Sequence, residues 1–254
     1  MMASNPHDGQ PSFPQAGFAT LTCIRRPHTL RLTMALQIGH QFKNGGILTI
    51  LGNDSIRIEN SQVDIDADGA NGQHGKPPAY APNSYNGPTL DDLSDAGSPG
   101  DWYGVVTDNG QGDGNPVVQG ASDPCPGAYV SATSLNLLKP DGSEFEPTNP
   151  MRYVDAATVP FLVICPDLVD AVGPVVFGCR AVLTNTQANI SIEAVVADGG
   201  NTNEMGEISL AAAQRLQIPG DARAVDTDAA LLTMEIYPGV AAVVDGVTYP
   251  LQHA

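Results

Sequence analysis

Short apolar runs separated by glycine, proline and asparagine recur along most of the chain. The first two, ILTIL and SIRIE, flank a Gly-Asn-Asp turn signal and predict a hairpin or meander. The run VPFLVIC at 159–165 is almost continuously apolar, which predicts a strand buried on both faces. GPVVFGCRAVLTN and NISIEAVVAD predict two further strands, the second with alternating isoleucines.

The C-terminal third predicts one helix and a closing sheet. SLAAAQRLQI, after Glu207, places Leu210, Ala213 and Leu216 on one side of an Ala-rich amphipathic helix. LLTMEIYPGVAAVVDGVTYPL predicts a closing strand, a Pro-Gly turn and a hairpin around Asp245-Gly246. We therefore expect a mainly β fold with one barrel-like sheet core and few short helices, because closure leaves no exposed sheet edges.

The pattern predicts one domain preceded by an arm. Residues 1–42 are polar and contain proline, so we expect a flexible N-terminal arm, and residues 43–254 are long enough to bury a substantial core in one domain. Between residues 72 and 100 the composition shifts to Pro, Asn, Ser and Gly. This predicts a long surface connection with at most one short helix, and such loops are often functional.

The charge narrows the possible partners. The chain carries 28 acidic and 11 basic residues, a net charge of −17. Such a field repels nucleic acid and attracts a polycation, although acidity can also serve solubility alone. We expect no membrane association, because no stretch approaches the roughly 20 apolar residues of a membrane span. The start of the chain shows no standard secretion signal.

Several classes of site are not favoured. Cys23, Cys125, Cys165 and Cys179 show no C-x-x-C spacing, which argues against a zinc knuckle or a thioredoxin-like motif. Cys165 and Cys179 could pair if their strands are adjacent, and buried thiols are the alternative. The histidines are scattered and no Gly-x-Ser-x-Gly elbow is present, so a serine or cysteine hydrolase is not expected.

Three acids alternate at the end of one predicted strand. Asp64, Asp66 and Asp68 have the spacing that opens an EF-hand loop, but the twelfth position is Gly75, where the loop needs glutamate. Alternate positions lie on one face of a strand, where neighbouring like charges are destabilising unless another interaction compensates for them. A cationic substrate, a bound metal or solvation could each provide that compensation.

A second pair of acids flanks a glycine-containing loop. Asp198 ends a predicted strand and Glu207 begins the predicted helix, with Gly199, Gly200 and Gly206 between them. Hydrolysis of a glycosidic bond needs one carboxylic acid and one carboxylate, and two acids on one loop could supply both. The alternative is that Glu207 stabilises a helix N-terminus and Asp198 is a turn residue.

The motif around this pair resembles a known family. AVVADGGNTNEMGEISLAAAQRLQI is similar to the signature of the fungal-type chitosanases, glycoside hydrolase family 75, in which a Gly-Glu-x-Ser precedes a short helix. Similarity extends over about residues 45–250. It departs from the fungal pattern in a shorter loop, in which Asn201-Thr202-Asn203-Glu204 replaces the usual proline. The further blocks that carry the resemblance are VDIDADGA, GPTLDDLSDAG, DWYGVVTDNG, PVVQGASDPCPGAYVSATSL, RYVDAATVPFLVICP and MEIYPGV.

The resemblance implies an activity and a fold. It implies a secreted, endo-acting hydrolase of β-1,4 bonds in chitosan, which works with inversion, needs no cofactor or metal and has a double-psi-type barrel; we expect a monomer. Asp198 and Glu207 match the family's essential carboxylates. We favour Glu207 as the acid and Asp198 as the base, and the exchanged assignment stays open.

The same resemblance gives the other candidate residues a role. Asp64, Asp66 and Asp68 would bind the ammonium groups of glucosamine, which are largely protonated below neutral pH. Trp102 and Tyr103 could stack on sugar faces or simply pack in the core. Two alternatives remain: the same fold acting on another amino-sugar glycan such as peptidoglycan, and a non-catalytic glycan-binding or structural module.

Overall fold

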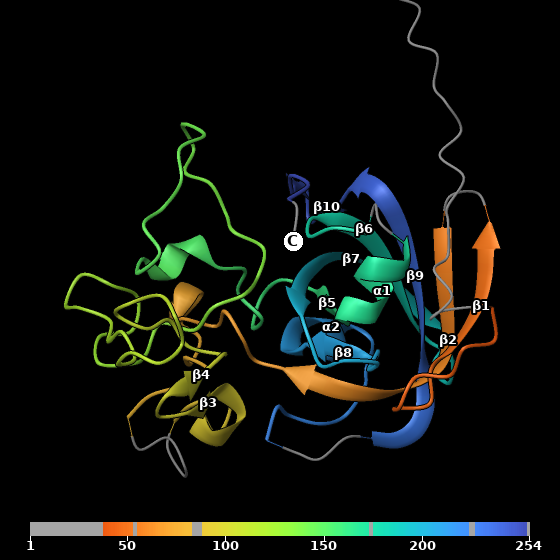
Figure 1. Ribbon diagram of the computed structural model, residues 1–254, viewed down its shortest axis with the longest axis horizontal. Coiled ribbons are helices and arrows are strands. Elements are labelled where there is room, and N and C mark those ends of the chain that lie inside the picture. The colour runs from red at the N-terminus through yellow and green to blue at the C-terminus, as the bar shows by residue number, and fades with distance from the viewer. Residues whose placement is uncertain (1–37, 53–54, 83–87, 173–174, 224–226, 253–254) are drawn as a thin grey trace, which may run out of the picture.

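The fold is a closed β-barrel with a loop-rich part at one side (Figure 1). The computed structural model describes residues 38–52, 55–82, 88–172, 175–223 and 227–252. Six strands close the barrel in the order β2-β8-β5-β7-β6-β9, with β9 pairing back to β2, and β1 extends the sheet beyond β2. The mainly β, barrel-like prediction is confirmed, whereas the double-psi description stays a prediction.

The bounds of the elements follow from the backbone hydrogen bonds. The barrel sheet comprises β1 Ile47–Gly52, β2 Ser55–Asp66, β5 Phe161–Ile164, β6 Cys179–Asn185, β7 Ile190–Gly199, β8 Glu207–Ser209 and β9 Thr227–Ala241. The two helices are α1 Pro166–Val172 and α2 Leu210–Arg215. The short elements are β3 Gly97–Ser98, β4 Asp101–Trp102, β10 Val243–Val244, β11 Val247–Thr248 and the 3₁₀ turns Gln73–Gly75, Leu93–Ala96 and Pro150–Arg152. Neither helix in these described ranges is long and apolar enough to cross a membrane.

Strand β5 lies between β8 and β7 in the barrel. All four of its residues are buried, and it pairs in parallel with β7 and antiparallel with β8. Strands β1 and β2 form the predicted hairpin. A continuous apolar run suits a strand that is covered on both faces, so this part of the prediction is confirmed.

The predicted helix is shorter than expected and begins later. Glu207 belongs to β8, and the residue that caps α2 is Ser209, whose hydroxyl accepts a hydrogen bond from the amide of Ala212 at 3.1 Å. The same hydroxyl donates to the carbonyl of Val159 at 2.8 Å. Helix capping by Glu207, the structural alternative to a catalytic role, is therefore wrong.

The predicted Pro-Gly turn near the C-terminus is also wrong. Strand β9 runs through Pro238 and Gly239 without reversing. Its register against β6 shifts there, and Gly239 has φ +71°, so the dipeptide forms a bulge in a long strand. The hairpin around Asp245-Gly246 is confirmed by the pairing of β10 with β11.

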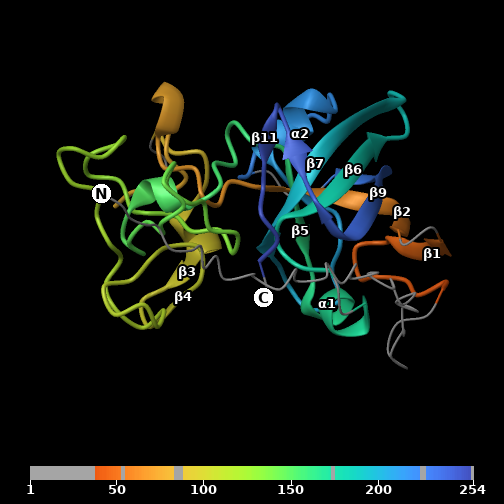
Figure 2. The same cartoon turned by 90° about the horizontal axis from the view of Figure 1, so that it is seen from above.

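The loop-rich part lies beside the barrel in both views (Figures 1 and 2). It contains the predicted long connection between residues 72 and 100, whose described part carries two short 3₁₀ turns, Gln73–Gly75 and Leu93–Ala96, where at most one short helix was expected. Within the loop-rich part, the buried side chain of Asn71 is hydrogen-bonded to the backbone of Ser131. It donates to the carbonyl of Ser131 at 2.9 Å and accepts from the amide of Ser131 at 2.7 Å. Asn71, which directly precedes the long connection, is therefore fixed against the segment around Ser131.

Two predictions concern the ends of the chain and the cysteines. Residues 1–37 of the predicted arm, with Cys23, lie outside the described residues. The last residues of that arm pack on the barrel, since Phe42 is 1% exposed and belongs to the core.

Cys165 is a buried free thiol, so it forms no disulfide with Cys179.

Candidate active site

Parallel pairing in the barrel brings the two candidate carboxylates to one region. Strand β2 runs parallel to β8 with Asp64 opposite Glu207, and β5 runs parallel to β7 with Val163 opposite Asp198. Since β8 also pairs with β5, the four strands are consecutive in the sheet. Asp64, Glu207, Val163 and Asp198 thus follow one another across neighbouring strands.

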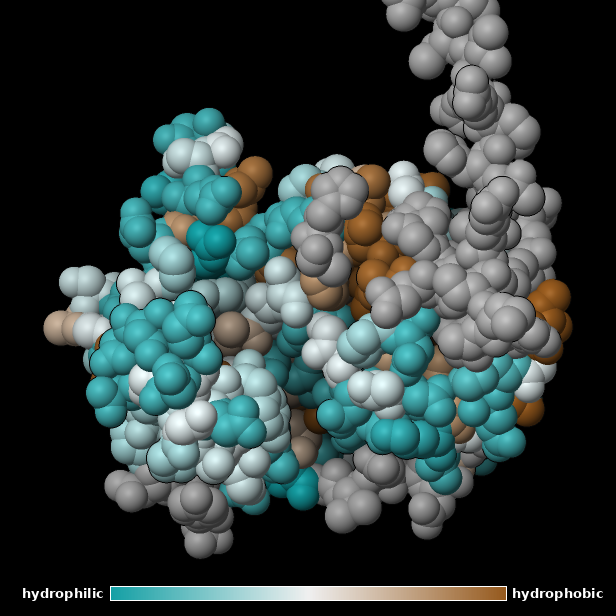
Figure 3. All heavy atoms as spheres, viewed as in Figure 1, coloured by the Kyte–Doolittle hydropathy of each residue, from teal (hydrophilic) through white to brown (hydrophobic). Residues whose placement is uncertain are grey.

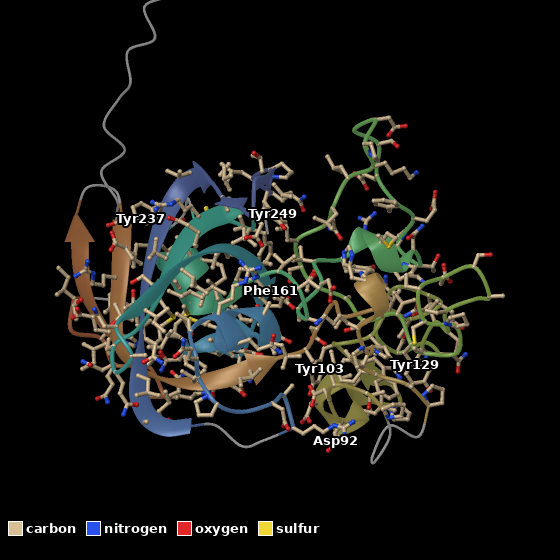
Figure 4. All side chains as sticks on the ribbon, turned by 180° about the vertical axis from the view of Figure 1, so that it is seen from behind. Asp92, Tyr103, Tyr129, Phe161, Tyr237 and Tyr249 are labelled. Atoms are coloured by element: carbon tan, nitrogen blue, oxygen red, sulfur yellow. The ribbon has the colours of Figure 1, made fainter. Side chains whose placement is uncertain are left out.

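These strand ends open into a large pocket of about 510 Å³. A hollow separates the barrel from the loop-rich part in Figure 3, and Tyr103 lies at this border in Figure 4. The volume is within the range of pockets that bind small molecules. The pocket is lined by Asp64, Ile65, Asp66, Asp68, Tyr80, Asp91, Asp95, Tyr103, Val163, Asp198, Gly199, Gly200, Asn201, Glu207, Ala222 and Arg223.

Most of the residues chosen from the sequence meet in this pocket. The three alternating acids, both loop acids and Tyr103 line it, and the Tyr103 side chain is 68% exposed. Trp102 does not line it, because its partly buried side chain packs against the hydrophobic core. For Trp102 the packing alternative is therefore the correct one.

Five further polar residues of the pocket were not predicted as site residues: Tyr80, Asp91, Asp95, Asn201 and Arg223. Asp91 and Asp95 come from TLDDLSDAG, whose density of acids in a long loop was an available signal. Tyr80 and Arg223 lie in segments without a distinguishing pattern. Arg223 is the only cation of the described pocket lining, and its guanidinium donates to the carbonyl of Thr89 at 2.7 Å.

Asp198 is held by hydrogen bonds to a single oxygen. Its Oδ1 accepts from the hydroxyl of Ser134 at 2.7 Å, from the amide of Ser134 at 3.0 Å and from the amide of Gly199 at 2.8 Å. Burial raises the pKa of Asp198 to about 6, and these hydrogen bonds oppose that rise. The carboxyl group therefore has a fixed orientation and ionises near pH 6.

Glu207 lies in a different electrostatic environment. Burial raises its pKa well above the usual range, and the nearby carboxylates of Asp66, Asp64 and Asp198 raise it further. Its Oε2 lies close to the loop backbone, because a Cβ added to Gly200 would approach it to 3.0 Å. Glu207 is accordingly the group that stays protonated when Asp198 has ionised.

Three other acids of the pocket, Asp66, Asp68 and Asp91, share this tendency to be neutral. Burial and the charge of Asp198 raise the pKa of Asp66, and burial and Asp66 raise that of Asp68. Burial raises the pKa of Asp91 to about 7, and the hydroxyl of Tyr80 donates to its Oδ2 at 3.3 Å. Ionising several neighbouring carboxyl groups at once is unfavourable, because their negative charges repel one another. A bound cation would offset that repulsion and so favour the ionised forms.

The loop between the two acids is fixed by its neighbours. Gly206 has φ +127°, and an added Cβ would lie 2.2 Å from the carbonyl oxygen of Gln62, so only glycine fits. The amide of Met205 donates to Asn44 Oδ1 at 3.1 Å, and the amide of Lys43 donates to the carbonyl of Asn203 at 2.9 Å. The separation between Asp198 and Glu207 is therefore set by rigid contacts.

Neither the described side chains nor similarity to known proteins assigns a function. In the described ranges, no group of three or more His, Cys, Asp or Glu residues is arranged to hold a metal ion. The chain matches no protein-family model, and no curated protein is significantly similar to it in sequence. The resemblance to chitosanases consequently rests on the sequence motifs and stays a prediction.

Proposed function

We propose that the protein is a chitosanase-like glycoside hydrolase that cleaves β-1,4 bonds with inversion. The observation that carries this proposal is the pairing of Asp198 and Glu207 in one acidic pocket, in environments that give them different pKa values. A glycosidase needs such a difference, because one carboxyl must carry a proton while the other is ionised.

The roles follow from these environments. Glu207 donates its proton to the glycosidic oxygen as the bond to the anomeric carbon breaks. Asp198 accepts a proton from a water molecule whose oxygen attacks that carbon from the opposite face. The products are an alcohol and a hemiacetal of inverted configuration, and the two carboxyl groups have exchanged protonation states.

The remaining lining supports a cationic sugar polymer as substrate. Asp64 and Asp95 are exposed acids in the wall of the pocket, where they can meet glucosamine ammonium groups. The exposed ring of Tyr103 offers an apolar face to a sugar. The net charge of −17 adds long-range attraction for a polycation.

Product stereochemistry tests this proposal most directly. With defined glucosamine oligomers, proton NMR early in the reaction should show the α anomer at the new reducing end, because inversion of a β bond gives α. Predominance of the β anomer would contradict the inverting mechanism. Turnover of peptidoglycan but not chitosan would change the substrate, and calorimetric glycan binding without any products would identify a non-catalytic module.

The contact between Ser134 and Asp198 predicts a specific pH effect. Removing the hydroxyl in Ser134→Ala takes away a hydrogen bond that favours the ionised base, so the pKa of Asp198 should rise. The acidic limb of the kcat/KM profile should move to higher pH. Activity on that limb should fall about tenfold, the change that corresponds to one pH unit.

Ser143→Ala is a matched control for this variant. Its hydroxyl also donates to an aspartate, Asp141, at 2.7 Å, but in an exposed loop that does not line the pocket. We expect its pH profile to equal that of the wild type. An unshifted acidic limb in Ser134→Ala would show that Ser134 does not control the base.

A further inference from the structure

The pocket is formed between two parts of the chain. Asp198 and Glu207 lie on the barrel strands β7 and β8, whereas Tyr80, Asp91 and Tyr103 belong to the loop-rich part. The loop-rich part leaves the barrel after β2 and returns before β5, and only β8 separates these two strands in the sheet. Because both chain connections are close together, the width of the pocket depends on non-covalent contacts across the border.

One contact across the border is made by Arg223. Its Nη2 atom donates to the carbonyl of Thr89 at 2.7 Å, to the hydroxyl of Thr89 and to the carbonyl of Asp91 at 3.4 Å. The hydroxyl of Thr89 in turn donates to the carbonyl of Asp91 at 3.1 Å. Both accepting residues are buried, so water competes little for these bonds, and a charged donor strengthens them.

The chain is anchored on each side of this contact. On the barrel side, Ile218 belongs to the hydrophobic core five residues before Arg223. On the other side, the amide of Asp91 donates to the carbonyl of Ala79 at 3.2 Å, and the hydroxyl of Tyr80 donates to Asp91 Oδ2 at 3.3 Å. Arg223 therefore joins the core of the barrel to the wall that carries Asp91 and Tyr80.

We propose that Arg223 is a positioning residue, which fixes the width of the pocket by holding residues 89–91 against the barrel. The ligand that this width suits, a glucosamine chain, rests on the proposed function. A wall that is already in place loses little conformational entropy when the chain binds, so the contact favours binding. Asp198 and Glu207 keep their positions on their strands without it, and Ser134 holds Asp198 separately.

Binding and turnover of a defined glucosamine oligomer test this role. Arg223→Met removes the donors but keeps an unbranched side chain. In an inactive Glu207→Gln background, calorimetry should show a Kd about tenfold higher, the order of one lost hydrogen bond from a charged donor. With Glu207 present, KM should rise by a similar factor while kcat changes less than about twofold.

Two arginine and lysine variants are matched to this one. Arg223→Lys should recover most of the affinity, because all three bonds start from one nitrogen and an ammonium group carries three donors on one nitrogen. Arg215→Met is the control: Arg215 also follows the Ala-rich segment of α2 and donates to a backbone carbonyl, that of Thr158 at 3.3 Å, but it does not line the pocket. Its Kd and KM should equal those of the wild type.

Hydrogen exchange measures the contact without any ligand. The amides of Leu90 and Asp91 donate to the carbonyls of Pro78 and Ala79, and both should exchange about tenfold faster in Arg223→Met but at the wild-type rate in Arg215→Met. Unchanged exchange in Arg223→Met, or a Kd equal to that of its background, would overturn the inference and leave the chitosanase proposal intact. Faster exchange without new reducing ends from any chitosan would overturn the proposed function and keep the role of Arg223.

Discussion

Replacing Asp198 by asparagine or Glu207 by glutamine should each lower kcat on chitosan about a thousandfold, within the range expected for a general acid or base. Neither amide can carry out the proton transfer of the carboxyl that it replaces. Release of reducing ends is the measurement. Full activity in either variant would refute the assignment of that residue.

The same two variants should keep or gain stability. Burial and the nearby like charges destabilise the ionised form of Glu207, and an amide of the same shape cannot ionise. We expect a melting temperature equal to or above that of the wild type. Glu146→Gln, in an exposed loop, is the matched control and should retain full activity. A large loss of melting temperature in the catalytic variants would indicate that these carboxyls have a structural role.

The stability of the protein should fall as the pH rises from about 5 to 8. Asp198 and Asp91 have folded-state pKa values of about 6 and about 7, above their usual 3.8, so the folded state binds more protons than the unfolded state in this window. Stability then decreases with pH until the folded-state pKa has been passed. Ionising Asp198 alone costs about 3 kcal/mol relative to an ordinary aspartate.

Calorimetry across this window would measure the effect. The melting temperature should be highest near pH 5 and decline towards pH 8, and Asp91→Asn should reduce the decline because it removes one of the titrating groups. A melting temperature that rises steadily from pH 5 to 8 would contradict the raised pKa values. At lower pH the trend should reverse, because Glu235 and Asp245 have lowered pKa values through their hydrogen bonds and their contacts with arginines.

The sequence predicted the elements whose signals are local. The continuous apolar run 159–165 identified β5, and the alternation before Asp198 identified β7. Asp64, Asp66 and Asp68 line one pocket, as expected, but only Asp64 and Asp66 lie in β2, and Asp68 lies in the turn that follows it. The acids of β2 line the same pocket as Glu207 because β2 pairs in parallel with β8. No local sequence pattern encodes this pairing.

The errors have the same origin. Glu207–Ser209 follows a glycine and precedes an Ala-rich run, so a helix was expected. The segment is a strand because all three of its residues pair with β2, and Ile208 also pairs with Leu162 of the neighbouring strand β5. Pro238-Gly239 is a strong turn signal, but pairing of β9 with β6 on both sides keeps the strand continuous. In each case long-range sheet pairing outweighs local propensity.

The contacts of residues 40–44 give the start of the described chain an unexpected importance. The ring Nε2 of His40 is hydrogen-bonded to Asn203 Oδ1 at 2.6 Å, and Asn44 Oδ1 accepts from the amide of Met205. This short segment therefore acts as a brace for the stretch that joins Asp198 to Glu207. Shortened versions of the protein made for assay or crystallisation should begin before His40, since trimming further would release the brace while leaving every barrel strand in place.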